Sequence, residues 1–225
     1  MPDLVVRRIE ALDEEQLIQA QVIYEEAFSP DLRVPFSELT RPGEADQTFV
    51  AMDGRAPAGV AALRLLGSVD WSFLRYFAIT AKRRSQGLGH QFWQFLHQSL
   101  RQEAWPACII FEVENPSETN GDKAERVIRQ RRINFWTACG ARQLPVSGYV
   151  LPDYTASGTT EAMLLMAATP AAVPAVQGDQ LRKLVRAIYT DRYGLLPNDP
   201  LVSRALASIA TPKPPPPTPH GSNGK

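Results

Sequence analysis

The sequence predicts an α/β domain built on one sheet. Residues 48–52 and 59–66 are apolar, strand-like runs on either side of Asp53-Gly54, a dipeptide typical of a hairpin turn. Residues 71–79 are apolar on both faces of the pleat, which predicts a strand in the middle of the sheet. The helix and strand that follow, up to residue 113, have the size of a right-handed crossover. A hairpin and a crossover on one sheet indicate the α/β class.

The elements before the hairpin are a strand and a helix. Residues 4–9 resemble a strand, and Asp13 followed by Gln16 forms a capping-box pattern that predicts a helix up to residue 28. A loop with several prolines and one short helical turn at residues 36–39 then lead into the hairpin. We expect the helix to bury a face made of Leu17, Ile18, Val22, Ala27 and Phe28.

The central strand and the crossover helix each have faces that follow from their periods. In residues 71–79 we expect one face with Trp71, Phe73, Phe77 and Ile79 and the other with Leu74, Tyr76 and Ala78. The helix is expected to bury Leu88, Phe92, Phe95, Leu96 and Leu100. A strand at residues 108–113 completes the crossover.

A second helix is predicted at residues 123–139, where Gly140 is a suitable C-terminal cap. Its apolar stripe is interrupted by Arg131 and Arg132 and consists of Ala124, Val127, Ile128, Phe135 and Trp136. Two strand-like segments, residues 143–151 and 161–168, close the region. Residues 1–169 are therefore expected to form one domain.

Residues 170–210 are predicted to be a helical extension of that domain. An amphipathic stripe there comprises Leu181, Leu184, Val185, Ile188, Tyr189 and Tyr193, and residues 201–209 suggest another helix. The stripe would either pack against the domain or form a homodimer contact. Residues 211–225 are rich in proline and are expected to be a disordered tail.

Composition narrows the functional classes. Lys plus Arg equals Asp plus Glu, 24 each, so no overall field attracts nucleic acid or an anionic membrane. Cys108 and Cys139 lack the spacing of metal ligands, and we expect neither a metal site nor a disulfide framework. No apolar run approaches a membrane span and the start lacks the layout of a secretory signal, which favours a cytoplasmic protein.

The segment RSQGLG, residues 84–89, lies between the central strand and the crossover helix. The first N–H groups of a helix have no partner within the helix and, with the helix dipole, favour anions. Gly87 and Gly89 would let the main chain approach a phosphate, and Arg84 would add positive charge. A structural interpretation stays open, in which the glycines only permit a tight turn.

This segment resembles the [Q/R]-x-x-G-x-[G/A] loop of the GNAT superfamily of acyl-CoA-dependent N-acetyltransferases. The segment NFWTACGA, residues 134–141, is similar to the second motif of that family, and the order of elements from residue 4 to 168 also fits. The resemblance implies the GNAT acyltransferase fold, with a mixed, mainly antiparallel central sheet flanked by helices. It also implies acetyl-CoA (coenzyme A) as co-substrate, no metal, and a small-molecule or peptide amine as acceptor.

The resemblance further implies where coenzyme A would bind. The amides of about residues 85–90 would hold its pyrophosphate, and the main chain of Phe77 and Ile79 would contact its pantetheine arm where two strands diverge. The cofactor-binding residues expected on this basis are Phe77, Ile79, Arg84, Ser85, Gln86, Gly87, Leu88, Gly89, His90, Asn134 and Trp136.

The chain departs from the family at the catalytic positions. Trp136 stands where many members have the tyrosine that protonates the leaving thiolate, and an indole is far too weak an acid, so it orients the sulfur or simply packs. Tyr149, Tyr76, Cys139 or solvent are possible substitutes.

The glutamate that many members carry on the central strand is absent as well. Glu112 and Glu114, on one face of the next strand, are the candidate bases, and the predicted catalytic residues are Glu112, Glu114 and Tyr149. Structural ion pairs with Arg131 or Arg132, or substrate recognition, are the alternatives for this acidic pair. The acceptor site would involve Tyr24, Glu25, Phe28, Arg33, Tyr149 and Tyr154.

Two other functions remain open at this point. The unusual catalytic positions are compatible with a silent acyl-CoA-binding module that regulates a partner. The Pro-rich tail is compatible with an interaction protein that recruits an aromatic-groove domain.

Overall fold

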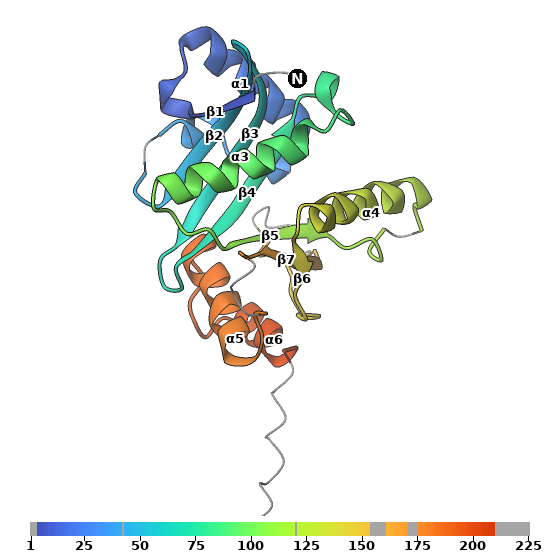
Figure 1. Cartoon of the computed structure of the whole chain (residues 1–225). Helices are drawn as coiled ribbons and strands as arrows, with labels where there is room; N and C mark the ends of the chain where they lie inside the picture. Colours follow the sequence, from blue (N-terminus) through green and yellow to red (C-terminus); the bar gives the residue numbers. More distant parts are fainter. Residues whose placement is uncertain (1–3, 42, 120, 154–160, 171–174, 210–225) are drawn as a thin grey trace, which may run out of the picture.

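A computed structural model describes residues 4–41, 43–119, 121–153, 161–170 and 175–209 (Figure 1). The predicted tail, residues 211–225, and Tyr154 lie outside the described residues. Within the described residues, seven strands form one sheet in the order β1-β2-β3-β4-β5-β7-β6. They are β1 (Leu4–Arg8), β2 (Asp46–Asp53), β3 (Ala56–Leu66), β4 (Trp71–Ile79), β5 (Ile109–Glu114), β6 (Arg142–Gln143) and β7 (Met163–Ala168).

The sheet is mixed and mainly antiparallel, as predicted. β2 and β3 form the expected hairpin, and Gly54 in its turn has the left-handed φ of 62° that suits glycine. The parallel pair is β4 with β5, which are joined by the crossover through helix α3 (Leu88–Gln102). β4 is central, with β3 on one side and β5 on the other.

Helices cover both faces of the sheet. α1 (Glu14–Ala27) and α2 (Phe36–Leu39) bury one face of β2, β3 and β4, whereas α3 and α4 (Lys123–Ala138) bury the opposite face. α5 (Gly178–Ala187), a π-helical turn η4 (Ile188–Arg192) and α6 (Pro200–Ala207) cover β5 and β7, at the end of the sheet away from β1 (Figure 1). The amphipathic stripe of residues 170–210 therefore packs against the sheet of its own chain.

A β-bulge at Arg75 changes the expected faces of β4. Ala62 pairs with Tyr76 but Leu63 pairs with Leu74, so Arg75 is an extra residue that opposes none on β3. The bulge reverses the alternation, and Phe77 and Ile79 share the α3 face with Leu74. Trp71 and Phe73 lie on the other face. The prediction that all four share one face was wrong because it assumed an unbroken period of two.

The buried faces of the helices also differ from the predicted ones. In α1, Ile18 and Val22 are 59% and 49% exposed, and the buried positions are Gln16, Ala20, Ile23 and Tyr24. Gln16 turns inward because it completes the capping box with Asp13 and donates to the carbonyl of Arg55. The predicted capping box is confirmed, but the helix is rotated relative to its most apolar stripe.

In α3, Phe92 is buried as predicted, but the second buried aromatic residue is Trp93, whereas Phe95 is 40% exposed. The indole of Trp93 donates to the carbonyl of Cys139 at 3.1 Å, which ties α3 to the end of α4. In α4, Val127 and Ile128 are 48% and 44% exposed, and Trp136 is the buried residue. α4 contacts the sheet mainly through its last turns, so its predicted stripe was too long.

The predicted strand at residues 143–151 was also wrong. Strand β6 spans two residues, and a single bridge between Val150 and Ala162 follows it. The segment between them stays bonded to β7 at its two ends, through the N–H of Leu144 to Leu165 and the N–H of Met163 to Tyr149, but it forms no continuous ladder. It buries Leu144, Val146 and Tyr149.

Candidate active site

The N-terminus of α3 has the geometry expected of an anion-binding helix end. Gly87 caps the helix with a left-handed φ of 81°, and Ser85 just before it also has a positive φ of 60°. The first helical N–H that finds a carbonyl is that of Gln91, which bonds Gly87 at 3.2 Å. Because helix geometry gives Leu88, Gly89 and His90 no such partner, their N–H groups point out of the helix end.

Basic side chains lie beside this end. Arg84 is exposed, and its Nε donates to the carbonyl of Ile79 at 3.0 Å, so its terminal nitrogens lie near the end of β4. Arg83 is held by Asp53 and by Gln86, and is less available to a ligand. The positive charge of Arg84 adds to that of the helix dipole.

The two glycines serve backbone and packing needs. Gly87 is required for its left-handed conformation. A Cβ on Gly89 would lie 3.1 Å from the ring of Phe135 on α4, closer than ordinary contact. Gly89 thus allows α3 and α4 to approach, which agrees with the structural interpretation of this residue. Neither role of the glycines supplies a partner for the N–H groups of Leu88, Gly89 and His90.

Strands β4 and β5 diverge next to the same helix end. They pair only at Ser72 with Ile109 and at Phe73 with Ile110, after which β5 continues along β7. The N–H of Thr80 bonds the carbonyl of Ala58 on β3. Alternate residues of a strand direct their main-chain groups to opposite neighbours, so the N–H and C=O of Phe77 and Ile79 point away from β3, toward the side of β5. This orientation exists only because the bulge reverses the alternation.

An aromatic cluster fills the space between the diverging strands on the α3 face. Trp136 is 8% exposed, and its ring centre lies 5.1 Å from that of Phe77 on β4 and 4.5 Å from that of Phe111 on β5. Trp93 and Phe135 complete the cluster. Trp136 is thus a packed aromatic residue, whereas Asn134 and His90 are exposed.

Glu112 is held by tyrosine hydroxyl groups on the opposite face of β5. Tyr149, which is fully buried, donates to Glu112, and the hydroxyl of Tyr193 lies 2.8 and 2.7 Å from its two carboxylate oxygens. Burial raises the pKa of Glu112, while both hydrogen bonds and the charge of Arg192 partly oppose that rise. The pKa of Tyr149 is raised well above its usual value by burial and by Glu112.

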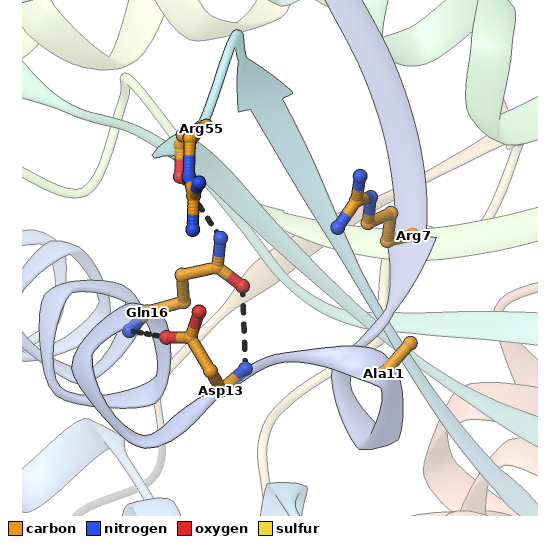
Figure 2. A pocket seen from close by; sticks show the side chains of 5 residues that line it. All are labelled: Arg7, Ala11, Asp13, Gln16 and Arg55. Atoms are coloured by element: carbon orange, nitrogen blue, oxygen red, sulfur yellow. Dashed lines mark hydrogen bonds between the residues drawn. The ribbon is translucent and has the colours of Figure 1, made fainter.

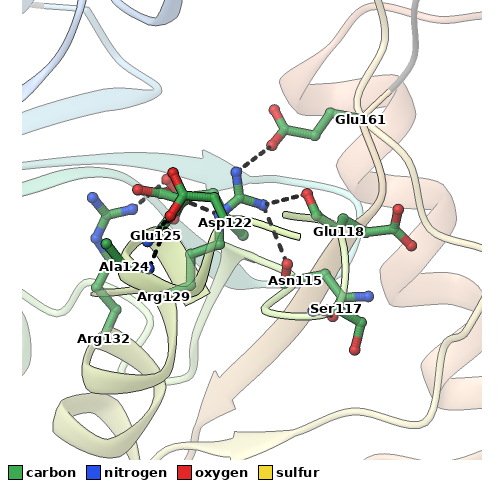
Figure 3. A network of polar contacts seen from close by, with 10 residues as sticks. Asn115, Ser117, Glu118, Asp122, Ala124, Glu125, Arg129, Arg132 and Glu161 are labelled. Atoms are coloured by element: carbon green, nitrogen blue, oxygen red, sulfur yellow. Dashed lines mark hydrogen bonds and ion pairs between the residues drawn. The ribbon is translucent and has the colours of Figure 1, made fainter. Parts of the chain in front are cut away.

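Glu114 belongs to a different network. It forms an ion pair with Arg132, one of the two arginines expected to partner this acidic pair. Burial alone would raise the pKa of Glu114, but the hydrogen bond and charge of Arg132 outweigh it and the pKa is lowered. Figure 3 shows the surrounding contacts, in which Arg129 bonds Glu125 and the carbonyls of Asn115 and Glu118. The network fixes the start of α4.

The residues expected at the acceptor site have mainly structural contacts. The hydroxyl of buried Tyr24 donates to the carbonyl of Val34 at 2.9 Å, and Tyr76 accepts from the N–H of the same residue. Arg33 donates to the carbonyls of Glu25 and Phe28 at the end of α1. Cys139 is the C-terminal cap of α4, where burial raises its pKa to about 11. Of the proposed substitutes for the missing acid, Tyr149 is the one that contacts a candidate base.

Two surface hollows lie elsewhere. The first, of about 370 Å³, is lined by Arg7, Ala11, Asp13, Gln16 and Arg55, where the capping box of α1 meets the hairpin turn (Figure 2). The second, of about 450 Å³, lies along α4 and is lined by Pro116, Ser117, Arg126, Val127 and Gln130. Neither is lined by the predicted site residues.

Sequence reasoning missed the contribution of the C-terminal segment to this site. Tyr193 was assigned to an apolar stripe, yet its hydroxyl reaches Glu112 across 81 positions of the chain. Arg192 lies over the rings of Tyr193 and Phe73, at 4.9 and 5.9 Å from their centres. The one available signal was a tyrosine at the end of an otherwise aliphatic stripe.

Solved structures share this arrangement of elements. Over 85% of its length the chain superposes on 99% of a Bacteroides thetaiotaomicron protein assigned to the GNAT family of acetyltransferases, with a TM-score of 0.64 and 20% identity. The chain has the GNAT fold. An aminoglycoside 6'-N-acetyltransferase, solved with coenzyme A, matches with a TM-score of 0.52 and 14% identity over 76% of this chain and 99% of that one. The sequence itself matches no protein-family model and no curated protein.

The GNAT fold confirms the resemblance found in the sequence at the level of architecture. Identities of 14% and 20% support the fold and leave the reaction to be argued from the site. Among the described residues, no helix is long and apolar enough to cross a membrane, and no group of three or more His, Cys, Asp or Glu side chains is placed to hold a metal ion.

Proposed function

We propose that this protein is an acetyl-CoA-dependent N-acetyltransferase that acetylates a small-molecule or peptide amine by direct attack in a ternary complex. The observation that carries the proposal is the juxtaposition of the α3 N-terminus, exposed Arg84 and the diverging edges of β4 and β5. One end of this region suits a diphosphate, and the adjoining strand edge presents main-chain groups that suit an amide-containing arm. Together they suit the pyrophosphate and the pantetheine arm of coenzyme A.

Within this proposal, Glu112 is the better candidate base. An amine must lose a proton to attack a thioester carbonyl, and a carboxylate whose pKa is raised accepts that proton more readily. Glu114, with a lowered pKa and a bound arginine, is less suited to this role. Attack of the amine nitrogen forms the new C–N bond, the C–S bond breaks, and the departing thiolate takes a proton from solvent.

Tyr149 would act on Glu112, not on the leaving thiolate. Its hydroxyl proton is directed at the carboxylate and its pKa is raised well above the usual value, so it is a weak acid. It would hold Glu112 in place. Trp136, packed between Phe77 and Phe111, would form part of the wall beneath the bound arm.

The coenzyme A site can be tested by reversing the charge of Arg84. Opposite unit charges at 4 Å in water attract by about 1 kcal/mol, so replacing one positive charge by a negative one changes the energy by about 2 kcal/mol. Arg84→Glu should therefore weaken acetyl-CoA binding roughly 30-fold by calorimetry, and less at high salt. Arg186→Glu, an equal charge change at an exposed site on α5, is the matched control and should leave the affinity unchanged.

The reaction can be tested separately by thiol release. Wild-type protein and acetyl-CoA are mixed with a panel of amines, and free coenzyme A is measured above solvent hydrolysis. Release with at least one amine supports the proposed function. Unchanged affinity in Arg84→Glu would contradict the assigned site. Tight binding of acetyl-CoA with no release for any amine would contradict the enzyme and indicate a silent binding module.

A further inference from the structure

The C-terminal helices reach the candidate base through one short segment. Helix α5 passes into the π-helical turn η4, after which the N–H of Tyr193 bonds the carbonyl of Ile188 at 3.2 Å. The wider turn inserts a residue and rotates the side chains that follow, so that Tyr193 points at β5. Such turns are rare in proteins and frequent at functional sites.

Contacts on both sides fix this segment. Asp191 accepts from the N–H and the hydroxyl of Ser68, at 3.1 and 2.7 Å, and so binds η4 to the turn between β3 and β4. The guanidinium of Arg192 covers the rings of Tyr193 and Phe73. The ring of Tyr193 is thereby held against the sheet, with its hydroxyl facing both oxygens of Glu112.

We infer that Tyr193 is a positioning residue for Glu112, and that the helical extension, residues 170–210, thereby forms part of the active site. This inference rests on the proposed function. Glu112 can rotate about its side-chain bonds, and a hydroxyl that spans both of its oxygens restrains that rotation. Tyr149, from the segment before β7, donates a hydrogen bond to Oε1 of Glu112. The extension would then be required for the chemistry and not only for stability.

The charged and titratable groups around Glu112 determine how its pKa changes when the hydroxyl of Tyr193 is removed. They are Tyr149 from the loop before β7, and Tyr189, Arg192 and Tyr193 from η4 and the residue after it. Burial raises the pKa of Glu112, and Tyr149, Tyr193 and Arg192 lower it. Loss of one hydroxyl should therefore raise the pKa further, so that the ionised base forms only at higher pH.

The test is Tyr193→Phe, which removes the hydroxyl and keeps the ring that Arg192 covers. A hydrogen bond to a charged group contributes enough to move a pKa by about one unit. The pKa of Glu112 is measured by carbon-13 carboxyl NMR of glutamate-labelled protein, with Glu112→Gln to assign the signal. We expect it to rise by about one unit, and the acid limb of kcat/KM, for an amine found in the screen, to rise with it. The Kd for acetyl-CoA should not change.

Tyr189→Phe is the matched control. The hydroxyl of Tyr189 donates to the carbonyl of Val150 at 2.9 Å and accepts from its N–H, so its loss should lower the melting temperature. It should not move the pKa of Glu112. A purely structural role for Tyr193 would leave the acid limb of kcat/KM in place, as this control does.

The outcomes separate this inference from the proposed function. If wild type releases coenzyme A with an amine but Tyr193→Phe leaves both the NMR pKa and the acid limb in place, the inference is wrong and the function stands. If wild type releases none with any amine, the proposed function fails, and even a shifted pKa would leave Tyr193 a structural contact only. A joint shift of pKa and acid limb supports both.

Discussion

The contact between Gly89 and Phe135 gives a prediction whose sign depends on the background. A methyl group on Gly89 would lie 3.1 and 3.2 Å from two atoms at the far edge of the Phe135 ring. Overpacking of this kind costs about 1–3 kcal/mol. Alanine gains up to about 1 kcal/mol over glycine within a helix. Gly89→Ala should therefore destabilise the protein by up to about 2 kcal/mol.

Phe135→Leu should reverse that sign, because leucine lacks the ring atoms that the methyl group would meet. In this background Gly89→Ala should be neutral or stabilising by up to about 1 kcal/mol, when measured by urea unfolding of the four proteins of the cycle. The methyl group points at Phe135 and not out of the helix end, so the double variant should keep its affinity for acetyl-CoA. An equal cost of Gly89→Ala in both backgrounds would refute the assigned contact.

Two further predictions concern titrating groups. Burial, aided by Arg101, lowers the pKa of His97 from 6.5 to about 4, so the unfolded chain takes up that proton first as pH falls. The free energy of unfolding should therefore fall by up to about 3 kcal/mol between pH 6.5 and 4. In urea unfolding, His97→Gln should show a smaller fall over the same pH range. An equal fall in both proteins would contradict the lowered pKa of His97. Glu112→Gln should lower kcat at least about 100-fold while Glu114→Gln changes it less than about threefold, and the reverse order would assign the base to Glu114.

Most of the fold follows from local signals in the sequence. The turn at Asp53-Gly54, the capping box of Asp13 and Gln16, and the glycine after α4 each fix a boundary through backbone chemistry that acts within a few residues. The buried helix faces were less predictable, because they depend on distant partners. Trp93 is turned inward by its bond to Cys139, 46 positions away, and no period in the sequence records that.

The candidate site also has a part that local sequence signals predict and a part that depends on distant contacts. The N-terminal end of α3, where we propose that the diphosphate binds, is local, and its glycines and arginine were recognisable as one segment. Glu112 and Tyr149 were each proposed as candidates, but their contact depends on a segment that forms no continuous ladder with β7 where a strand was predicted. Tyr193 was placed in a core stripe because the π-helical turn that redirects it has no sequence signature of its own.

The bulge at Arg75 connects the fold to the proposed reaction. Without the extra residue, the alternation that places the N–H of Ser72 toward β5 would continue to Tyr76 and Ala78, and the main chain of Phe77 and Ile79 would bond β3. The extra residue Arg75, with its side chain 7% exposed, forms an ion pair with Asp46, which also binds Arg64. The bulge thus determines which backbone groups of β4 face the diverging strand, and the polar cluster joins it to β2 and β3. The proposed site thus combines a glycine-containing loop, which a sequence motif can predict, with a strand edge that depends on the bulge, which the motif does not predict.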